Sequence, residues 1–136
     1  MKVELTRKNQ TFHYEAKAGE HLINIDGNPT IGGEDKGARP MEILLIWVAG
    51  CASIDLGLIL KKQKQELTDY SMEISGERDE DAAKAFNAVH LHFKLEGKID
   101  EKKAQKAAEL AVNKYCSAIQ SLKKSIKITY EISIKK

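Results

Sequence analysis

The stretch GARPMEILLIWVAGCASIDLGLILKKQKQ, residues 37–65, decides the fold that we expect for this chain. Pro40 suits the first turn of a helix, and the closing lysines suit the negative end of the helix dipole. Residues 43–60 between them are apolar nearly all round, which is typical of a helix buried on every side. In a chain of 136 residues such a helix is central or lies in an oligomer interface. We therefore expect a long helix from near Pro40 to about Gln65.

The same segment is about long enough to span a membrane. Asp55 lies inside it, however, and a charged residue near the centre of a membrane helix costs roughly 2.5 to 3.5 kcal/mol. The N-terminal residues have no apolar run of the kind that a secretory signal needs. We therefore expect a cytoplasmic protein without a membrane segment.

Alternating runs on either side of this helix predict strands. Residues 3–26 resemble a three-stranded antiparallel meander, and residues 70–78 and 89–96 a second antiparallel pair, with Arg78 on its covered side. Asp100 is a plausible N-cap for an Ala-rich helix to about Tyr115, and residues 126–134 form a last strand. The order βββ-α-ββ-α-β predicts a single α+β domain over residues 1–136, with mostly antiparallel sheet.

Composition excludes several functions. The chain has 22 basic and 20 acidic residues, so bulk charge gives no reason to expect nucleic acid or a membrane surface as partner. Its glycines fit neither phosphate-binding spacing, and no serine stands in a nucleophile-elbow setting. We expect no cofactor. Only three residues are arginines: Arg7, Arg39 and Arg78.

The two cysteines, Cys51 and Cys116, are separated by 64 residues, which matches no zinc-binding spacing. A structural disulfide is also not expected in a cytoplasmic chain. Two interpretations stay open: a pair of buried small hydrophobic residues, or a reactive dithiol, since each cysteine lies on a predicted helix.

Other residues have a functional and a structural interpretation. Glu42 is either a first-turn acid favoured by the helix dipole or part of the helix side that carries Cys51. Asp55 is the other acid of the apolar helix, where a charge must be paired or protonated. His90 and His92 share one face of a strand and could bind a metal with a thiol, but a polar outer face is the favoured interpretation, and we expect no metal.

Two segments carry a family resemblance. GARPMEILLIWVAGCASIDL, residues 37–56, resembles the central-helix signature of the OsmC/Ohr family, in which a Pro, a Glu and an apolar run lead to Gly-Cys. NKYCSAIQSL, residues 113–122, resembles the helix end that carries the second cysteine of that family. Residues 69–81 and 90–100 resemble the strand pair between them, so the resemblance covers about residues 37–134.

The resemblance implies an OsmC-like fold: an intertwined homodimer with a long buried central helix and active sites at the subunit interface. It also implies a peroxiredoxin-like peroxidase of oxidative stress defence, which reduces small organic hydroperoxides and is recycled by a dithiol or lipoyl reductant. In this scheme Cys51 attacks the peroxide and Cys116 resolves the product as a disulfide.

Glu42 matches the family glutamate that orients an arginine toward the reactive thiol, and this chain offers Arg39 or Arg7 for that arginine. The alternative function is a non-peroxidatic dimer that binds a small thiol-reactive ligand or acts as a redox sensor.

Overall fold

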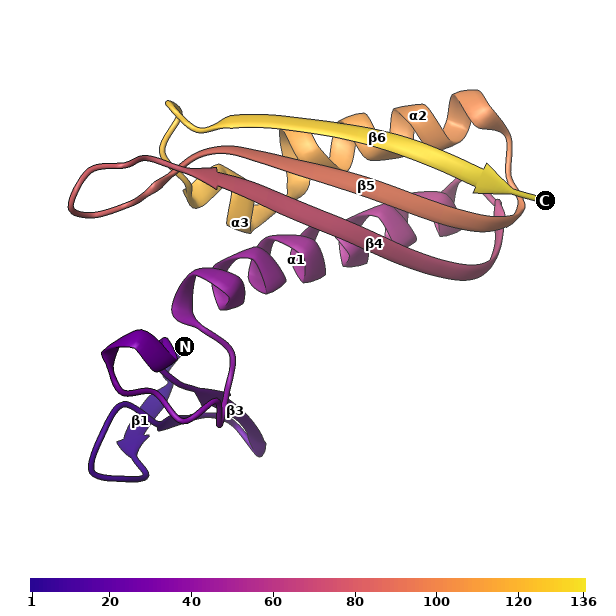
Figure 1. The fold of residues 1–136 in the computed structure, drawn as a ribbon. Coiled ribbons are helices and arrows are strands. Elements are labelled where there is room, and N and C mark those ends of the chain that lie inside the picture. Colours follow the sequence, from indigo (N-terminus) through magenta and orange to yellow (C-terminus); the bar gives the residue numbers. More distant parts are fainter. The chain divides into compact units, whose positions relative to one another are not determined.

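The computed structural model describes residues 1–136 and has the predicted α+β character (Figure 1). The chain forms two compact units, Met1–Leu44 and Leu45–Lys136. The elements, in chain order, are β1 (Glu4–Arg7), β2 (Tyr14–Ala18), β3 (His21–Ile25), the 3-10 turn η1 (Pro29–Ile31), α1 (Pro40–Lys62), β4 (Glu66–Arg78), β5 (Phe86–Lys98), α2 (Glu101–Leu110), the π-helical segment η2 (Ala111–Tyr115), α3 (Ser117–Ser121) and β6 (Lys127–Lys135).

The first unit contains the predicted meander, because β1, β2 and β3 pair antiparallel in that order. The loop after β3 is built on Asp26, which is fully buried and accepts the backbone N–H groups of Gly27, Glu34 and Lys36 at 2.7, 3.1 and 3.1 Å. Burial alone would raise the pKa of this carboxyl, but the three donors hold the pKa below its ordinary value. The loop therefore depends on an ionised Asp26.

The end of this loop lies directly against β3. The N–H of Asp26 donates to the carbonyl of Ala38 at 3.1 Å, and a Cβ atom at Gly37 would lie 2.4 Å from the carbonyl of Asn24. Only glycine fits so close to another backbone. This contact fixes where the chain enters α1.

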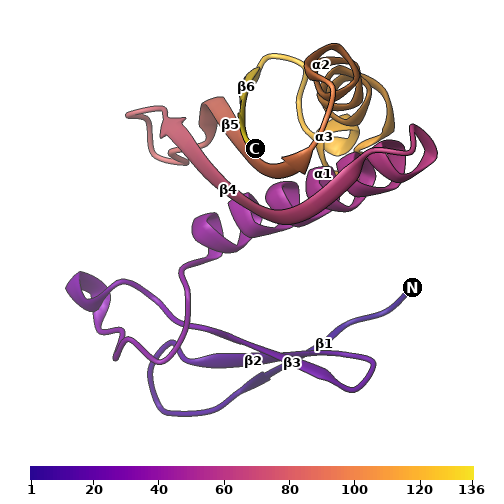
Figure 2. The same cartoon turned by 90° about the vertical axis from the view of Figure 1, so that its right-hand side faces the viewer.

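The second unit contains a sheet in the order β4-β5-β6, in which β4 and β5 pair antiparallel as predicted. The pairing of β5 with β6 is parallel, because the chain crosses over through α2 and α3 between these two strands. The helices lie on one face of the sheet (Figure 2). On that face the side chains of β5 are buried, namely Val89, Leu91, Phe93 and Leu95.

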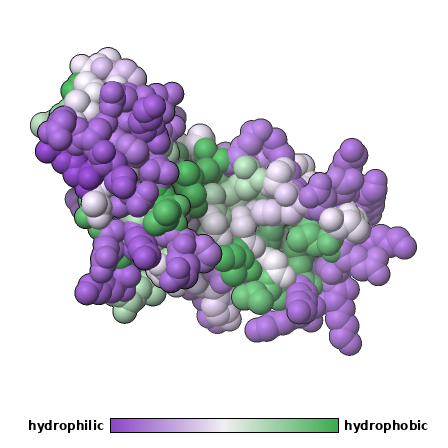
Figure 3. All heavy atoms as spheres, turned by 90° about the horizontal axis from the view of Figure 1, so that it is seen from below, coloured by the Kyte–Doolittle hydropathy of each residue, from purple (hydrophilic) through white to green (hydrophobic).

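Helix α1 buries one stripe of side chains rather than its whole surface. Four residues at four-residue spacing are buried, Val48, Ala52, Leu56 and Leu60. Large apolar side chains on the rest of the helix are exposed, among them Ile46 at 61% and Ile54 at 67%. One chain alone thus does not bury the helix on every side, and the expected position of the helix in an oligomer interface stays a prediction. In the view from below, Figure 3 shows hydrophobic residues (green) on the molecular face to which the exposed side of α1 belongs.

The helix ends at Lys62, slightly before the predicted Gln65. Lys64 has a φ of 58°, a left-handed conformation that stops a helix, and the N–H of Gln65 then donates to the carbonyl of Leu60 at 3.0 Å. By length and composition alone α1 could cross a membrane, a test that the core helix of a water-soluble protein passes equally.

The predicted position of Arg78 is wrong. The register of β4 and β5 shifts between Glu77 and Arg78, and such an irregularity changes which face the next side chain occupies. Arg78 is exposed, and its Nε donates to the carbonyl of Lys84 at 2.6 Å. Arg78 therefore belongs to the hairpin end and not to the covered face.

Candidate functional site: a thiol pair beside a carboxylate

The central feature of the second unit is a pair of thiols from two helical segments. Cys51 lies on α1 beside the fully buried Ala52, and Cys116 lies between η2 and α3. Their Sγ atoms lie within 4.8 Å of each other, and both cysteines are free. The predicted proximity of the two thiols is confirmed, although 64 residues separate them in the sequence.

A helix interruption places Cys116. Asp100 caps α2 as predicted, since its carboxylate accepts the N–H of Lys103 at 2.9 Å. The helix then continues as the π segment η2, whose last hydrogen bond runs from the N–H of Cys116 to the carbonyl of Ala111 at 2.9 Å. Cys116 adopts extended backbone angles, and its Sγ accepts the N–H of Ile119 at 3.4 Å. Single π turns of this kind are frequent at functional sites.

The two thiols differ in their surroundings. Cys116 is fully buried, whereas Cys51 is only half-buried. Burial raises the pKa of the Cys116 thiol to about 11, and the neighbouring Cys51 adds to this rise against the hydrogen bond from Ile119. Cys51 is therefore the thiol that a dissolved molecule reaches, and Cys116 is the thiol held protonated beside it.

Asp55 completes the site, although the sequence alone assigned it no role. It follows Cys51 by four residues, so both side chains lie on the same side of α1. One of its carboxylate oxygens lies within 4.8 Å of both Sγ atoms. Its Oδ2 atom is buried and has no hydrogen-bond partner. Its four-residue spacing from Cys51 is the sequence signal that could have pointed to this residue.

The trio Cys51, Asp55 and Cys116 also presents three donor atoms that a zinc ion accepts in proteins. It contains neither histidine of the predicted metal alternative. His90 contacts Thr129 at 2.7 Å, and His92 contacts Ser133 at 3.0 Å. Both histidines thus take part in a polar network between β5 and β6, as the favoured interpretation expected.

Arg39 and Glu42 interact at the start of α1, but not through the guanidinium. The backbone N–H of Arg39 donates to Glu42 Oε1 at 2.9 Å, which is half of a capping box. The guanidinium of Arg39 instead bonds Asp35 at 3.2 Å and the carbonyl of Gly37 at 2.9 Å. These contacts lie within the first unit, and they agree with the first-turn interpretation of Glu42.

Helix α1 is fixed on the sheet close to the site. Ser53, two residues after Cys51, shares a hydrogen bond of 2.7 Å with the hydroxyl of Tyr70 on β4. Burial raises the pKa of Tyr70, while the bond to Ser53 lowers it. The phenol thus stays protonated at neutral pH and serves as a contact between helix and sheet.

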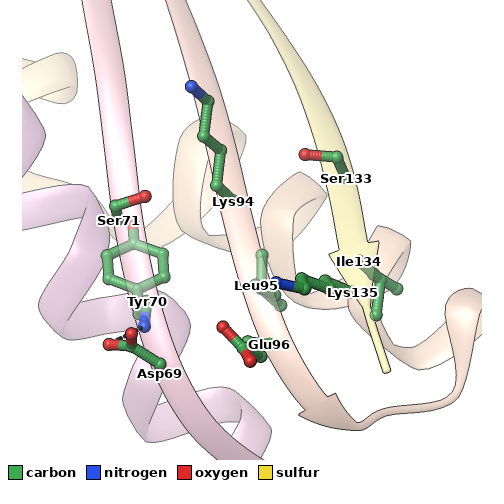
Figure 4. Close-up of a pocket in the computed structure, with 9 residues that line it drawn as sticks. All are labelled: Asp69, Tyr70, Ser71, Lys94, Leu95, Glu96, Ser133, Ile134 and Lys135. Carbon is green, nitrogen blue, oxygen red and sulfur yellow. Dashed lines mark hydrogen bonds between the residues drawn. The ribbon is translucent and has the colours of Figure 1, made fainter.

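A hollow of about 320 Å³ lies elsewhere on this unit, and Figure 4 shows its lining residues on β4, β5 and β6. Polar side chains such as Ser71, Lys94 and Ser133 line it, together with Leu95 and Ile134. None of Cys51, Asp55 and Cys116 is among the lining residues. The hollow is therefore separate from the thiol chemistry.

Together these features define an α+β protein whose long central helix brings an accessible thiol against a buried one. Comparisons with known proteins lead to one family. The OsmC-like protein family matches residues 33–131. Protein YhfA of Escherichia coli strain K12 is 34% identical over 125 residues, which are 91% of this chain and 90% of that protein. The chain belongs to the OsmC-like family.

Solved structures extend the similarity over almost the whole chain. A hypothetical protein from Aquifex aeolicus is 31% identical, with a TM-score of 0.83 over 99% of this chain and 97% of that one. An organic hydroperoxide resistance protein OsmC from Legionella pneumophila is 18% identical, with a TM-score of 0.69, and the match covers 98% of this chain and 95% of that one. At this lower identity the likeness concerns the fold alone, which confirms the predicted OsmC-like fold.

Proposed function

We propose that this protein is a thiol-dependent peroxidase that reduces organic hydroperoxides through Cys51 and Cys116, in defence against oxidative stress. One observation carries the proposal: two free thiols lie within 4.8 Å, one half-buried and one fully buried. This asymmetry suits a cycle in which one thiol meets the substrate and the other waits inside. Membership of the family, which includes a protein named for organic hydroperoxide resistance, supports the choice of substrate.

In the first step of the proposed cycle, the thiolate of Cys51 attacks one peroxide oxygen. The O–O bond breaks, the sulfur is oxidised to sulfenic acid, and the alkoxide leaves and takes up a proton as an alcohol. In the second step Cys116 attacks the Cys51 sulfur, so that a disulfide forms and water leaves. A dithiol or lipoyl reductant then restores both thiols by exchange.

Arg39 and Glu42 have assisting roles in this proposal. A cation near Cys51 would stabilise its thiolate and the developing negative charge on the leaving oxygen. The family resemblance is the ground for proposing Arg39 in this role. Its ion pair with Asp35, which is 81% exposed, contributes at most about 1 kcal/mol and would cost little to break. Glu42 would hold the start of α1 and, with it, the backbone of Arg39.

We also propose that the protein works as a cytoplasmic homodimer. The exposed apolar side of α1, which includes Ile46, Trp47, Ile54 and Leu58, is larger than single scattered surface residues explain. A second copy packed on this side would bury it. A reducing cytoplasm would keep both thiols available for the proposed cycle.

The experiment that tests the function is peroxide consumption. The reduced protein is mixed with cumene hydroperoxide and either dithiothreitol or dihydrolipoamide, and peroxide loss is followed in wild type, Cys51→Ser and Cys116→Ser. We expect turnover in wild type only. Peroxide loss no faster than with reductant alone would reject the peroxidase and favour the ligand-binding or redox-sensing alternative.

A further inference from the structure

The proposed cycle leaves one polar group of the site without a role. Asp55 Oδ2 is buried with no hydrogen-bond partner, although buried carboxylate oxygens normally have one. The contrast within the same chain is clear, because the carboxylate of Asp26 accepts three backbone N–H groups. Asp26 organises a loop, whereas the free oxygen of Asp55 supports no backbone.

What does lie beside Asp55 is the thiol pair. A carboxylate oxygen of Asp55 and the Sγ atoms of Cys51 and Cys116 all lie within 4.8 Å of one another. A thiol is a weak hydrogen donor and an ionised carboxylate only accepts. The Asp55 carboxylate therefore offers an acceptor within 4.8 Å of the Cys116 sulfur.

The disulfide-forming step needs such an acceptor. Cys116 must attack as a thiolate, but it is fully buried and its pKa is raised to about 11. At pH 7 only about one molecule in ten thousand would then carry the thiolate at equilibrium. Because bulk water does not reach Cys116, the proton has to pass to a group inside the protein.

We propose that Asp55 is the catalytic proton acceptor for Cys116 when the disulfide forms, an inference that rests on the proposed redox function of the pair. The S–H proton of Cys116 moves to the Asp55 carboxylate, and the thiolate attacks the sulfur of Cys51. The new S–S bond replaces the S–O bond of the sulfenic acid. The leaving hydroxide then takes the proton back from Asp55 and departs as water, so the carboxylate is regenerated.

The titratable groups that meet here are few. Helix α1 contributes Cys51 and Asp55, and the break between η2 and α3 contributes Cys116. From β4, Tyr70 approaches the same helix, but its hydroxyl is bonded to Ser53. Asp55 is therefore the one carboxylate of this group.

The test uses a reaction that does not depend on peroxide. The reduced full-length protein is mixed with the aromatic disulfide dithiobis(nitrobenzoate), which releases coloured thionitrobenzoate in two phases. The first phase reports attack by the accessible Cys51, which forms a mixed disulfide. The second reports attack by Cys116 on that mixed disulfide, and it should be missing in Cys116→Ser.

In Asp55→Asn we expect the rate of the first phase to stay within about threefold of wild type. The second phase should be slowed about 100-fold at pH 7, because a general base contributes at least about that factor to the rate. The slowed phase should accelerate about tenfold per pH unit as the thiol of Cys116 ionises without help. Asp55→Glu should recover part of the rate. The matched control Glu109→Gln, which removes an exposed acid of α2, should behave as wild type.

A second phase at the wild-type rate in folded Asp55→Asn would overturn the proposal, and so would equal slowing of both phases. Should that variant not fold, the pH profile of wild type decides: a second phase that is flat from pH 7 to about 9 supports Asp55, and a tenfold rise per pH unit rejects it. Peroxide consumption by the same proteins separates the two proposals, because a peroxidase failure leaves the two-phase result intact.

Discussion

Cys51 and Cys116 lie with their sulfur atoms within 4.8 Å of each other, and only Cys51 is accessible from outside. Different structural elements hold the two cysteines in place. Cys51 is held by the regular part of α1, whereas Cys116 is held at a break between a π segment and a short helix. An unequal pair of this kind predicts unequal consequences when each thiol is removed.

The first prediction concerns the oxidised products. After one equivalent of hydroperoxide, wild type should lose two hydrogens as the disulfide forms. Cys116→Ser should instead gain one or two oxygens on Cys51, because no resolving thiol remains. Cys51→Ser should stay unmodified, since the serine hydroxyl is not acidic enough to act as the nucleophile. Intact mass spectrometry measures all three, and oxidation of Cys51→Ser at the wild-type rate would require withdrawing the assignment.

The sequence was informative where a local pattern determines structure. Pro40 and the lysine-rich end placed α1 within three residues at its C-terminal end, and Asp100 placed the start of α2. The meeting of Cys51 and Cys116 depends on tertiary packing across 64 residues, so the spacing alone left it open and only the family resemblance indicated it.

Other features depend on strand register and side-chain partners, which the hydrophobic periodicity of the sequence does not reveal. A register shift moved Arg78 out of the covered face of β4, and the partner of the Arg39 guanidinium turned out to be Asp35. Asp55 was recognised only as an acid in need of a partner, because its neighbour Cys116 comes from a distant helix.

The second prediction concerns Arg39. If its guanidinium assists Cys51, Arg39→Met should slow sulfenic acid formation at least about tenfold while leaving the disulfide-forming step unchanged. Rapid-quench oxidation followed by trapping of the sulfenic acid measures the first step. Arg78→Met is the control, because Arg78 bonds the hairpin carbonyl of Lys84 and should have no effect. An unchanged first step in Arg39→Met would remove Arg39 from the site.

The third prediction concerns the apolar side of α1. Wild type should be a dimer by light scattering at about 10 µM, with more than about 2,000 Å² buried in total, as obligate homodimers show. Ile54→Lys would place a charge in that interface and should weaken dimerisation at least tenfold, because a buried unpaired charge is strongly unfavourable. Gln105→Lys on the exposed surface of α2 should leave the dimer intact. A wild-type monomer at this concentration would refute the proposal.

The last prediction concerns Asp26 and the loop that leads into α1. Asp26→Asn keeps the size of the side chain but loses the charge that accepts three N–H groups, so the thermal midpoint should fall by on the order of 5 °C at pH 7. The pKa of Asp26 in the folded protein lies below its ordinary value, so its contribution is present above that value. It should be lost progressively as the pH falls from about 4, where the unfolded chain takes up the proton, through the lower pKa of the folded state.

Scanning calorimetry or circular dichroism melts from pH 7 down to about pH 3 test this linkage for Asp26. The gap between the midpoints of wild type and Asp26→Asn should narrow toward the acid end, because protonation of Asp26 in the unfolded chain removes the advantage of the charged carboxylate. Glu20→Gln removes an exposed acid of the same unit and should match wild type at every pH. A gap between wild type and Asp26→Asn that stays constant down to pH 3 would show that the ionised carboxylate does not stabilise the loop.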